Sequence, residues 1–199
     1  MKDEYLVFTG RPNAGKSSII RAITGLNVAS GKRPGTTRRI SEYSLSKGLT
    51  LVDMPGYGRL TGASRRTEDG VKDEVLEFLE SNAGEIALAV HVLDISTFRE
   101  VTRRLERKGI ISVDVEMILL LRDLLDEGHL VAANKVDKAD HDEREEALVE
   151  LEALIGGEQI LSLGYIFPVS ARTGEGLGEL KSAIHTRLVA KGFRTPFRL

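Results

Sequence analysis

The 199-residue sequence contains no cysteine, which excludes disulfide bonds and thiolate metal sites. Its formal net charge is only −2, which excludes a strong overall field that would attract nucleic acid. Long apolar runs are absent too, because the stretch IALAVHVLD at 86–94 is too short to cross a bilayer. The start, MKDEYLVFTG, lacks the pattern of a signal peptide. We therefore expect a cytoplasmic protein that does not enter the membrane.

Charge is unevenly distributed although its sum is small. Residues 31–72 carry nine basic and four acidic side chains, and residues 180–199 carry five basic and no acidic ones. Residues 137–158 carry nine acidic and two basic side chains. Clusters of this kind are most often solvated helix surfaces, but the two basic segments are also candidates for contact with a polyanion.

Short apolar runs alternate with longer amphipathic stretches, and this alternation predicts an α/β fold. The expected strands are 5–9, 42–46, 49–53, 86–94, 130–134 and 166–170, and the expected helices are 17–24, 71–82, 113–126, 142–154 and 177–190. Nearly continuous apolar strands indicate a mostly parallel sheet that is covered on both faces. A hairpin around Lys47 and Gly48 predicts one antiparallel edge strand. We expect a three-layer P-loop sandwich with a six-stranded sheet, forming a single domain over residues 1–199.

The segment GRPNAGKS at 10–17 lies between an expected strand and an expected helix, and it matches the phosphate-binding pattern G-x-x-x-x-G-K-[ST]. Gly10 and Gly15 permit backbone angles that other residues resist, so successive N–H groups can point at phosphate oxygens. The positive end of the helix adds to the attraction. Lys16 is expected to reach the β- and γ-phosphates, and Ser17 is expected to offer its hydroxyl to Mg²⁺.

The segment AANKVDK at 132–138 follows an apolar strand and can select the base. Asp137 can accept hydrogen bonds from the N1–H and the exocyclic amine of guanine, a donor pair that adenine lacks. Asn134 is expected to bind the N7/O6 edge, and the stem of Lys135 is expected to lie over the ring. This motif argues against a P-loop kinase, because kinases of that class lack it.

A second strand end, FPVSARTGEG at 167–176, is expected on the same side of the base. It can bring Ser170 and the backbone N–H of Ala171 to the guanine O6. A site that buries hydrogen-bonding groups rejects a base that cannot pair with them. We therefore expect GTP and GDP as ligands.

Two further segments are expected to sense the γ-phosphate. LVDMPG at 51–56 ends a strand with Asp53, which is placed to hold Mg²⁺ through water, and its Gly56 N–H can contact the γ-phosphate. In RPGTTRR at 33–39, Thr37 is expected to supply a second hydroxyl for Mg²⁺. Both segments should order with GTP and relax with GDP, as in an order–disorder switch.

These motifs define the predicted site. The residues expected to contribute directly to hydrolysis are Lys16, Thr37 and Gly56, and the residues expected to hold the metal are Ser17, Thr37 and Asp53. The residues expected to surround the nucleotide are Gly10, Arg11, Pro12, Asn13, Ala14, Gly15, Lys16, Ser17, Ser18, Gly35, Thr36, Thr37, Asp53, Met54, Pro55, Gly56, Asn134, Lys135, Val136, Asp137, Ser170, Ala171 and Arg172.

The motifs GRPNAGKS, PGTT, DMPG, NKVD and SAR resemble, in this order and across almost the whole chain, the five boxes of a translation-factor-class GTPase. The continuation DMPGYG resembles the DLPGYG of the EngB (YihA/YsxC) family of small single-domain GTPases. The segment 112–138, SVDVEMILLLRDLLDEGHLVAANKVDK, is similar to that family's Asp-x-x-Met helix and guanine-reading strand. The resemblance implies a GTPase that assists assembly of the large ribosomal subunit and is associated with cell division and septation.

The sequence also departs from that family. The phosphate-binding segment is equally similar to those of MnmE and Der, Asn134 stands where the family has threonine, and residues 97–112 form a longer segment than in bacterial members. An archaeal or divergent member would explain these differences. Two alternatives stay open: a GTPase that acts in tRNA modification, and a module that senses guanine nucleotides with little hydrolysis.

The sequence lacks an evident catalytic group for water. Ras-like enzymes place a glutamine directly after the glycine of the D-x-x-G box, and Tyr57 stands there in this chain. We expect slow intrinsic hydrolysis that a partner or a monovalent cation raises. Asn13 could ligate K⁺ near the β–γ bridging oxygen, as relatives with similar phosphate loops imply, or it could only stabilise the turn.

The expected macromolecular partner is the large ribosomal subunit or its RNA, bound by a monomer. Candidate contacts are the basic residues near the switch segments, the arginine-rich run at 99–108 and the tail KGFRTPFRL at 191–199. Phe193 and Phe197 could stack on bases beside Arg194 and Arg198. The alternative, which we favour slightly, is that the tail folds back and buries both phenylalanines.

Overall fold

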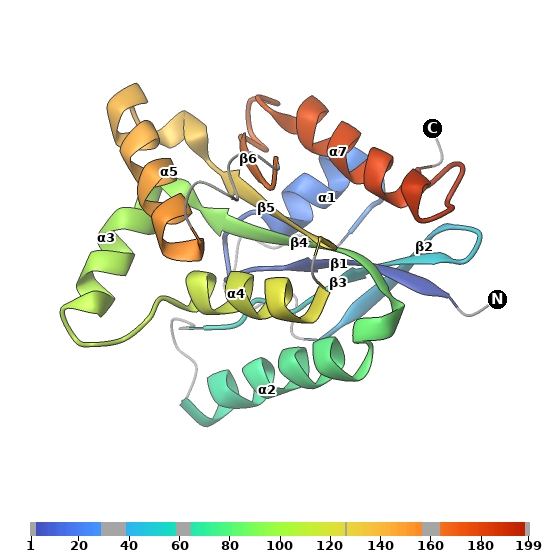
Figure 1. Ribbon diagram of the computed structural model, residues 1–199, viewed down its shortest axis with the longest axis horizontal. Helices are drawn as coiled ribbons and strands as arrows, with labels where there is room; N and C mark the ends of the chain where they lie inside the picture. The colour runs from blue at the N-terminus through green and yellow to red at the C-terminus, as the bar shows by residue number, and fades with distance from the viewer. Residues whose placement is uncertain (1–2, 29–38, 59–64, 126, 157–163, 198–199) are drawn as a thin grey trace.

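The computed structural model describes residues 3–28, 39–58, 65–125, 127–156 and 164–197. These residues form a six-stranded sheet with helices on both faces (Figure 1). The strands are β1 (Glu4–Thr9), β2 (Ser41–Ser46), β3 (Leu49–Asp53), β4 (Ile86–Asp94), β5 (His129–Asn134) and β6 (Ile166–Val169). The helices are α1 (Lys16–Thr24), α2 (Arg65–Ser81), α3 (Ile95–Glu106), α4 (Val113–Leu125), α5 (His141–Ile155) and α7 (Leu177–Ala190), with short 3₁₀ turns at Ala83–Glu85 and Val136–Lys138.

The sheet has the order β2-β3-β1-β4-β5-β6. All neighbouring strands are parallel except β2 and β3, which form an antiparallel hairpin at the edge. Gly48 in the hairpin turn has φ +76°, a backbone angle that glycine adopts at little cost. The predicted three-layer α/β architecture with one antiparallel edge strand is confirmed.

Two features of the helices differ from the prediction. α2 begins at Arg65, six residues before the expected start, because its first turns, RRTEDG, contain no apolar residue that would mark a helix. α3 was not predicted at all. It buries Ile95 and Phe98 but otherwise carries mostly polar side chains, and an ion-pair network ties it to α5: Arg99 contacts Glu146 and Glu150, and Arg103 contacts Glu150.

The alternation of side chains along the strands divides the core between the two faces of the sheet. In β1, Leu6 and Phe8 pack with α1 and α7, whereas Val7 packs with α2 and α4. A third cluster joins α3, α4 and α5 over β4 and β5. Because strand side chains alternate between faces, a run of buried apolar residues in β1 serves both layers.

The register of the parallel strands brings their carboxyl ends to one edge of the sheet. Phe8 pairs with Asp53, Asp94 pairs with Asn134, and Asn134 pairs with Val169. The loops that follow β1, β3, β5 and β6 therefore emerge side by side. Ligands of open α/β sheets bind at this edge.

Candidate functional site

The phosphate loop occupies residues 10–15, between β1 and α1. Gly10 has φ +142°, and a Cβ atom added there would lie 2.1 Å from the carbonyl oxygen of Val92. Gly15 has φ +106°, and a Cβ atom added there would lie 2.1 Å from Nδ2 of Asn134. Glycine is therefore required at both positions for its backbone angle and for the close approach of a neighbour.

Helix α1 begins directly after this loop, at Lys16. No side chain among the described residues caps its first turn, and that turn contains no acidic residue. Free N–H groups and the helix dipole at such a terminus favour an anion. The start of α1 thus has the properties that a phosphate group requires.

Three side chains that were predicted to act together do lie together. Lys16 is only 7% exposed, and its Nζ donates to the carbonyl oxygen of Gly10 at 3.3 Å. The hydroxyl of Ser17 donates to Oδ2 of Asp53 at 3.3 Å. The other carboxylate oxygen of Asp53, Oδ1, is buried and has no hydrogen-bond partner among the described residues.

The electrostatics of this group show what it lacks. Burial lowers the pKa of Lys16, although the charge of Asp53 acts in the opposite direction. Burial likewise raises the pKa of Asp53, against the effects of Lys16 and Ser17. For both the Lys16 ammonium and the Asp53 carboxylate, the loss of hydration on burial therefore outweighs their mutual attraction. A phosphate beside Lys16 and a divalent cation beside Asp53 would supply the missing compensation, so these residues fit a magnesium–nucleotide complex.

The turn after β3 lies directly on the phosphate loop. Met54 is buried, and its N–H donates to the carbonyl oxygen of Phe8 at 3.0 Å. A Cβ atom added to Gly56 would lie 2.8 Å from the backbone nitrogen of Pro12, so only glycine fits there without a shift. Pro55, between them, is buried. The predicted γ-phosphate sensor therefore adjoins the loop that was predicted to hold the phosphates.

The remaining loop residues have distinct environments. Asn13 is exposed and has φ +64°, a left-handed angle that asparagine tolerates better than most residues. Ala14 is buried, and its N–H donates to the carbonyl oxygen of Arg11 at 3.2 Å. Ser18 is partly exposed in the first turn of α1. The predicted switch residues Gly35, Thr36 and Thr37 lie outside the described residues.

Asn134 joins the phosphate loop to the guanine-side loops. Its side chain is buried, its Nδ2 donates to the carbonyl oxygen of Ala14 at 2.7 Å, and its Oδ1 accepts from the N–H of Ala171 at 3.0 Å. The Ala171 N–H that was predicted to reach guanine O6 is thus engaged by Asn134 in this structure. Asn134 thus links the phosphate loop to the loop after β6 by hydrogen bonds, and its predicted contact with the base stays a prediction.

Asp137 is surrounded by donors from the loop after β6. Its Oδ1 accepts from the hydroxyl of Ser170 at 2.5 Å, and its Oδ2 accepts from Nε of Arg172 at 2.7 Å. The Ser170 hydrogen bond, helped by Arg172, lowers the pKa of this carboxyl, so it is ionised at neutral pH. The predicted juxtaposition of NKVD and SAR is present, and Arg172 now occupies an oxygen that the guanine amine was expected to use.

The two residues between Asn134 and Asp137 support this arrangement. Lys135 has φ +69°, and its Nζ lies 2.5 Å from Oδ2 of Asp94, at the end of β4. Val136 is buried in the cluster beneath α3, α4 and α5. The ion pair ties the Lys135 side chain to the end of β4, and its predicted position over the base stays a prediction.

Tyr57 points into the core. Its side chain is fully buried, and its hydroxyl lies 3.3 Å from Nδ1 of His91. Burial, reinforced by the negative charge of Asp114, raises the pKa of the phenol well above its usual value. The residue that replaces the Ras-type glutamine is therefore a neutral core residue here, which agrees with the expectation that it does not orient water.

Two residues of this region were not predicted from the sequence. His91 is fully buried in β4, and Asp114 is 2% exposed at the start of α4, where its Oδ2 lies 2.8 Å from Nε of Arg11 in the phosphate loop. A signal was present in both cases. His91 interrupts an otherwise apolar strand, and Asp114 is the acidic residue of the Asp-x-x-Met pattern.

Comparisons with known proteins decide the family. A family model described as "50S ribosome-binding GTPase" matches residues 5–135. A probable GTP-binding protein EngB of Methanopyrus kandleri is 42% identical over 195 residues, which cover 94% of each chain. Another from Archaeoglobus fulgidus is 35% identical over 202 residues, which cover 98% of this chain and all of the relative. The chain belongs to the EngB family of GTPases.

The solved structures agree. The crystal structure of a probable GTP-binding protein EngB superimposes with a TM-score of 0.82 at 32% identity, covering 94% of this chain and 99% of that one. As an EngB-family GTPase the protein binds GTP and GDP and hydrolyses GTP. The relatives named above are archaeal, which is consistent with the expectation of an archaeal or divergent member of the family. Among the described residues, no helix is both long and apolar enough to span a membrane.

Proposed function

We propose that this EngB-family GTPase is a nucleotide-controlled switch that acts in assembly of the large ribosomal subunit. Its single GTPase domain, residues 1–199, would work as a cytoplasmic monomer and contribute to cell division through ribosome supply. The matching family is described by binding to the 50S ribosome, which supports this partner. The observation that carries the switch is the packing of Gly56 against Pro12, because a nucleotide in the phosphate loop must then meet the turn after β3.

The proposed nucleotide site uses the residues predicted from the sequence. Lys16 and the start of α1 bind the phosphates, and Asp137 with the Ser170 loop reads guanine. Ser17 and Asp53, with Thr37 from outside the described residues, would hold Mg²⁺, and the unpartnered Oδ1 of Asp53 supports this assignment. When bound, the ion neutralises charge on the β- and γ-phosphates.

We infer slow intrinsic hydrolysis from the position of Tyr57. Its phenol is buried and neutral, so it cannot orient a water molecule at the γ-phosphate. A GTPase without its own water-orienting group remains in the GTP form until a partner supplies one. We propose that the ribosomal particle plays this part.

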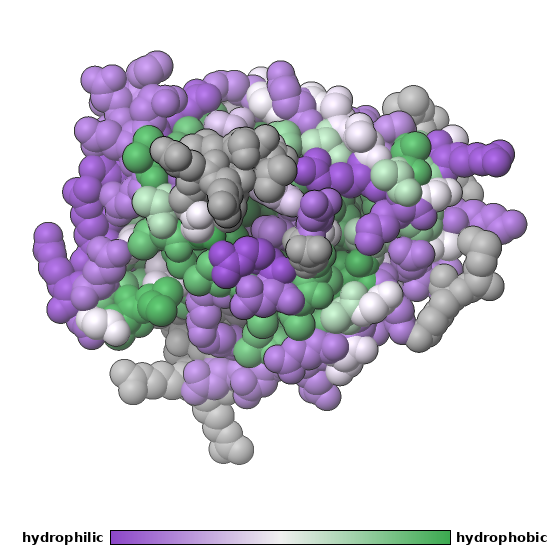
Figure 2. Space-filling view, in the orientation of Figure 1, coloured by the Kyte–Doolittle hydropathy of each residue, from purple (hydrophilic) through white to green (hydrophobic). Residues whose placement is uncertain are grey.

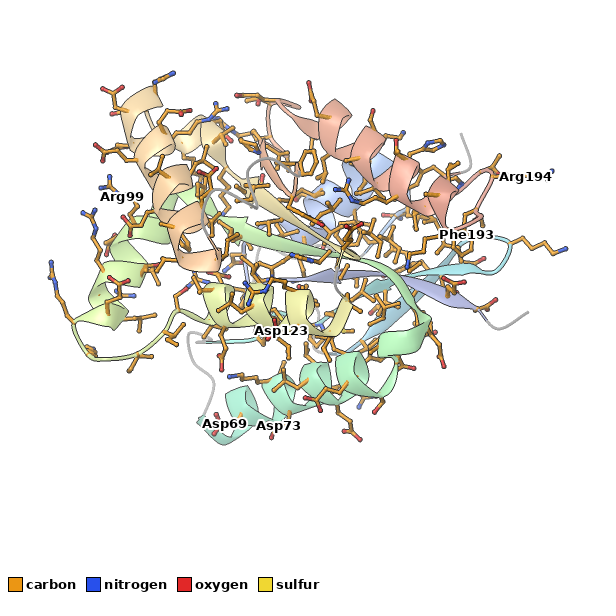
Figure 3. All side chains as sticks on the ribbon, viewed as in Figure 1. Asp69, Asp73, Arg99, Asp123, Phe193 and Arg194 are labelled. Carbon is orange, nitrogen blue, oxygen red and sulfur yellow. The ribbon has the colours of Figure 1, made fainter. Side chains whose placement is uncertain are left out.

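Part of the arginine-rich run at 99–108 is engaged within the protein. Arg99 and Arg103 are paired with acidic residues of α5, whereas Arg104, Arg107 and Lys108 are exposed beyond them. Figure 2 shows the hydrophilic side chains over α3 and α5, and Figure 3 shows Arg99 and Arg194 at opposite ends of the same view. We propose the exposed end of α3 as the phosphate-contacting part of this surface.

The C-terminal tail contributes less to that surface. Phe197 is 7% exposed and packs near Lys181, whose Nζ lies 5.6 Å from the ring centroid. Phe193 packs partly buried against the core. The folded-back tail that we favoured is therefore confirmed for Phe197, whereas Phe193 is only partly buried, and Lys191 and Arg194 are the exposed basic residues of this segment among those that the structure describes.

Co-sedimentation with ribosomal particles tests the proposed partner. We expect the protein to pellet with large subunits or their precursors in a non-hydrolysable GTP analogue and to stay in the supernatant in GDP. Small subunits serve as the control particle. Equal pelleting in both nucleotides, or none in either, would contradict a GTP-dependent role in assembly. Single-turnover hydrolysis with and without the particles separates a switch from a sensor that does not hydrolyse.

A monovalent cation is the second proposed activator. The side chain of Asn13 is exposed beside the phosphate loop and would be free to ligate K⁺, whereas its left-handed backbone favours a role in the turn alone. We expect hydrolysis to be about tenfold faster in KCl than in NaCl at equal ionic strength, as a positioned cation stabilises the charge of the transition state. Equal rates in the two salts would remove the potassium proposal.

A further inference from the structure

A chain of buried polar contacts runs beneath the phosphate loop. Nδ1 of His91 lies 3.0 Å from the Thr9 hydroxyl and 3.3 Å from the Tyr57 hydroxyl. Nε2 of His91 lies 3.3 Å from Oδ1 of Asp114, whose Oδ2 forms the ion pair with Nε of Arg11. These five residues, which we call the His91 relay, come from β1, the phosphate loop, the turn after β3, β4 and α4.

The relay is costly as a purely structural device. Thr9, Tyr57 and His91 are fully buried, and Asp114 is 2% exposed. Polar groups at this depth lose hydration and regain it only through well-placed partners. Apolar residues of similar size would fill the same space without that cost, and buried ion pairs often stabilise a fold less than apolar packing does.

The contacts have a consistent direction. We assign the imidazole proton to Nε2, which then donates to Asp114, and Nδ1 accepts from a hydroxyl. Asp114 accepts this bond on one oxygen and faces the Arg11 guanidinium with the other. Nδ1 has one lone pair for two neighbouring hydroxyls, so it accepts from either Thr9 or Tyr57, and the Tyr57 hydroxyl has both His91 and Thr9 as buried hydrogen-bonding partners. Removal of the Tyr57 hydroxyl would take away an interaction and leave the ring in place.

Both ends of the relay return to the nucleotide site. Tyr57 directly follows Gly56, which packs on Pro12 of the phosphate loop. A Cβ atom added to Gly58 would lie 3.8 Å from Cγ and Cδ of Arg11, so the Arg11 stem lies against the residue that follows Tyr57. The relay and these backbone contacts form a closed ring that joins residues 11–12 to residues 56–58.

We propose that His91 and Asp114 are positioning residues of the GTPase site, which hold Tyr57 and Arg11 in register so that the turn at Gly56 stays seated on the phosphate loop. The proposal rests on the GTP-binding role proposed above for that turn. Through Asp114, helix α4 would then influence the proposed contact of Gly56 with the γ-phosphate, although no residue of α4 lies among the nucleotide motifs. GDP lacks the γ-phosphate, so its affinity does not depend on this seating.

The test compares nucleotide affinities of the full-length protein. Tyr57→Phe removes one hydroxyl and retains the ring, and Asp114→Asn keeps an acceptor for His91 but removes the charge that faces Arg11. We expect each variant to bind a non-hydrolysable GTP analogue about three- to tenfold more weakly, the range expected for one hydrogen bond, with GDP affinity unchanged. Asp114→Ala should have a larger effect, and Asp114→Asn should restore part of it.

The matched control is Tyr5→Phe. Tyr5 lies in β1 and packs edge to face on Phe78, away from the relay. Tyr5→Phe should leave the affinities for GDP and for the GTP analogue unchanged. Should Tyr57→Phe and Asp114→Asn lower the melting temperature yet leave the ratio of the two affinities within twofold of the wild type, the relay is only structural and the proposal is wrong.

Other outcomes are distinguishable. If an Asp114 variant does not fold, Tyr57→Phe alone decides, because it retains the ring and the packing. If the wild type shows no γ-phosphate-dependent affinity, the role assigned to Gly56 fails, whatever the variants do.

Discussion

Replacing Asp137 by asparagine is expected to lower the affinity for GTP by about 10⁴-fold, the penalty for a buried hydrogen-bonding site that loses its match, and to create affinity for XTP. The Asp137 carboxylate is ionised, because the Ser170 hydroxyl and Arg172 lower its pKa. It can accept from both guanine donors, whereas asparagine would set an amide N–H against the guanine amine. Xanthine has a carbonyl oxygen at that position and can accept from the amide. Competition titrations with GTP and XTP measure this change of nucleotide preference.

The control for this change is Glu175→Gln, which also converts a carboxylate to an amide in the loop after β6. Glu175 pairs with Arg144 of α5 at 2.6 Å and does not contact Asp137 in the hydrogen bonds of the described residues. This variant should retain the wild-type preference for GTP. An Asp137→Asn variant that binds GTP within tenfold of the wild type would show that guanine is read elsewhere.

Replacing Lys16 by alanine is expected to weaken binding of GTP by about 10²–10³-fold and to abolish measurable hydrolysis, because truncating one partner of a buried charge pair between a protein and its ligand costs about 2–5 kcal/mol. Lys16 is 7% exposed, and its charge favours the ionised form of Asp53. Without it, Asp53 would be buried without a countercharge and its pKa would rise further. Nucleotide titration and a phosphate-release assay measure the two effects.

Two other variants separate the loss of the Lys16 charge from less specific effects of the substitution. Lys16→Met retains the apolar stem and isolates the loss of charge, so it should behave like Lys16→Ala. Lys72→Ala removes the same side chain from an exposed ion pair with Glu116 and should leave nucleotide binding unchanged. Full triphosphate affinity in both Lys16 variants would exclude this lysine as the phosphate ligand.

The sequence predicted the sheet well for a physical reason. Each of the six expected strands lies within one residue of its observed bounds. In β1, β3, β4 and β5 the prediction rested on short apolar runs, which are largely buried in the structure. The antiparallel edge could be predicted from Lys47-Gly48, because only a hairpin joins two strands that closely. Composition and local spacing suffice where burial is continuous along the chain.

Helix α3 shows where this reasoning fails. It buries Ile95, Phe98 and Thr102 at helical spacing, but only two of these three are apolar, and the arginine-rich run that follows was interpreted as a charged surface segment and not as the outer face of a helix. Much of its attachment comes from Arg99 and Arg103, whose partners on α5 lie about fifty residues away in the sequence. Such pairing appears only once both helices are placed on the sheet.

The candidate nucleotide site also has one part that the sequence could indicate and another part that it could not. The motif residues could be predicted because phosphate and guanine impose fixed chemistry at fixed spacing, and the described ones gather at one edge. The supporting contacts could not. Asn134 bridging Ala14 to Ala171, Arg172 facing Asp137 and the Arg11–Asp114 pair each join segments that are distant in the sequence.

Calorimetric titration of the wild-type protein with GTP, GDP and ATP, in magnesium buffer, tests the central claim most directly. The pairing of Lys16 with the phosphates and of Asp137 with guanine predicts tight binding of GTP and GDP, with ATP at least about 10³-fold weaker. Binding of ATP as tight as that of GTP, or no binding of any nucleotide by the folded protein, would contradict the account.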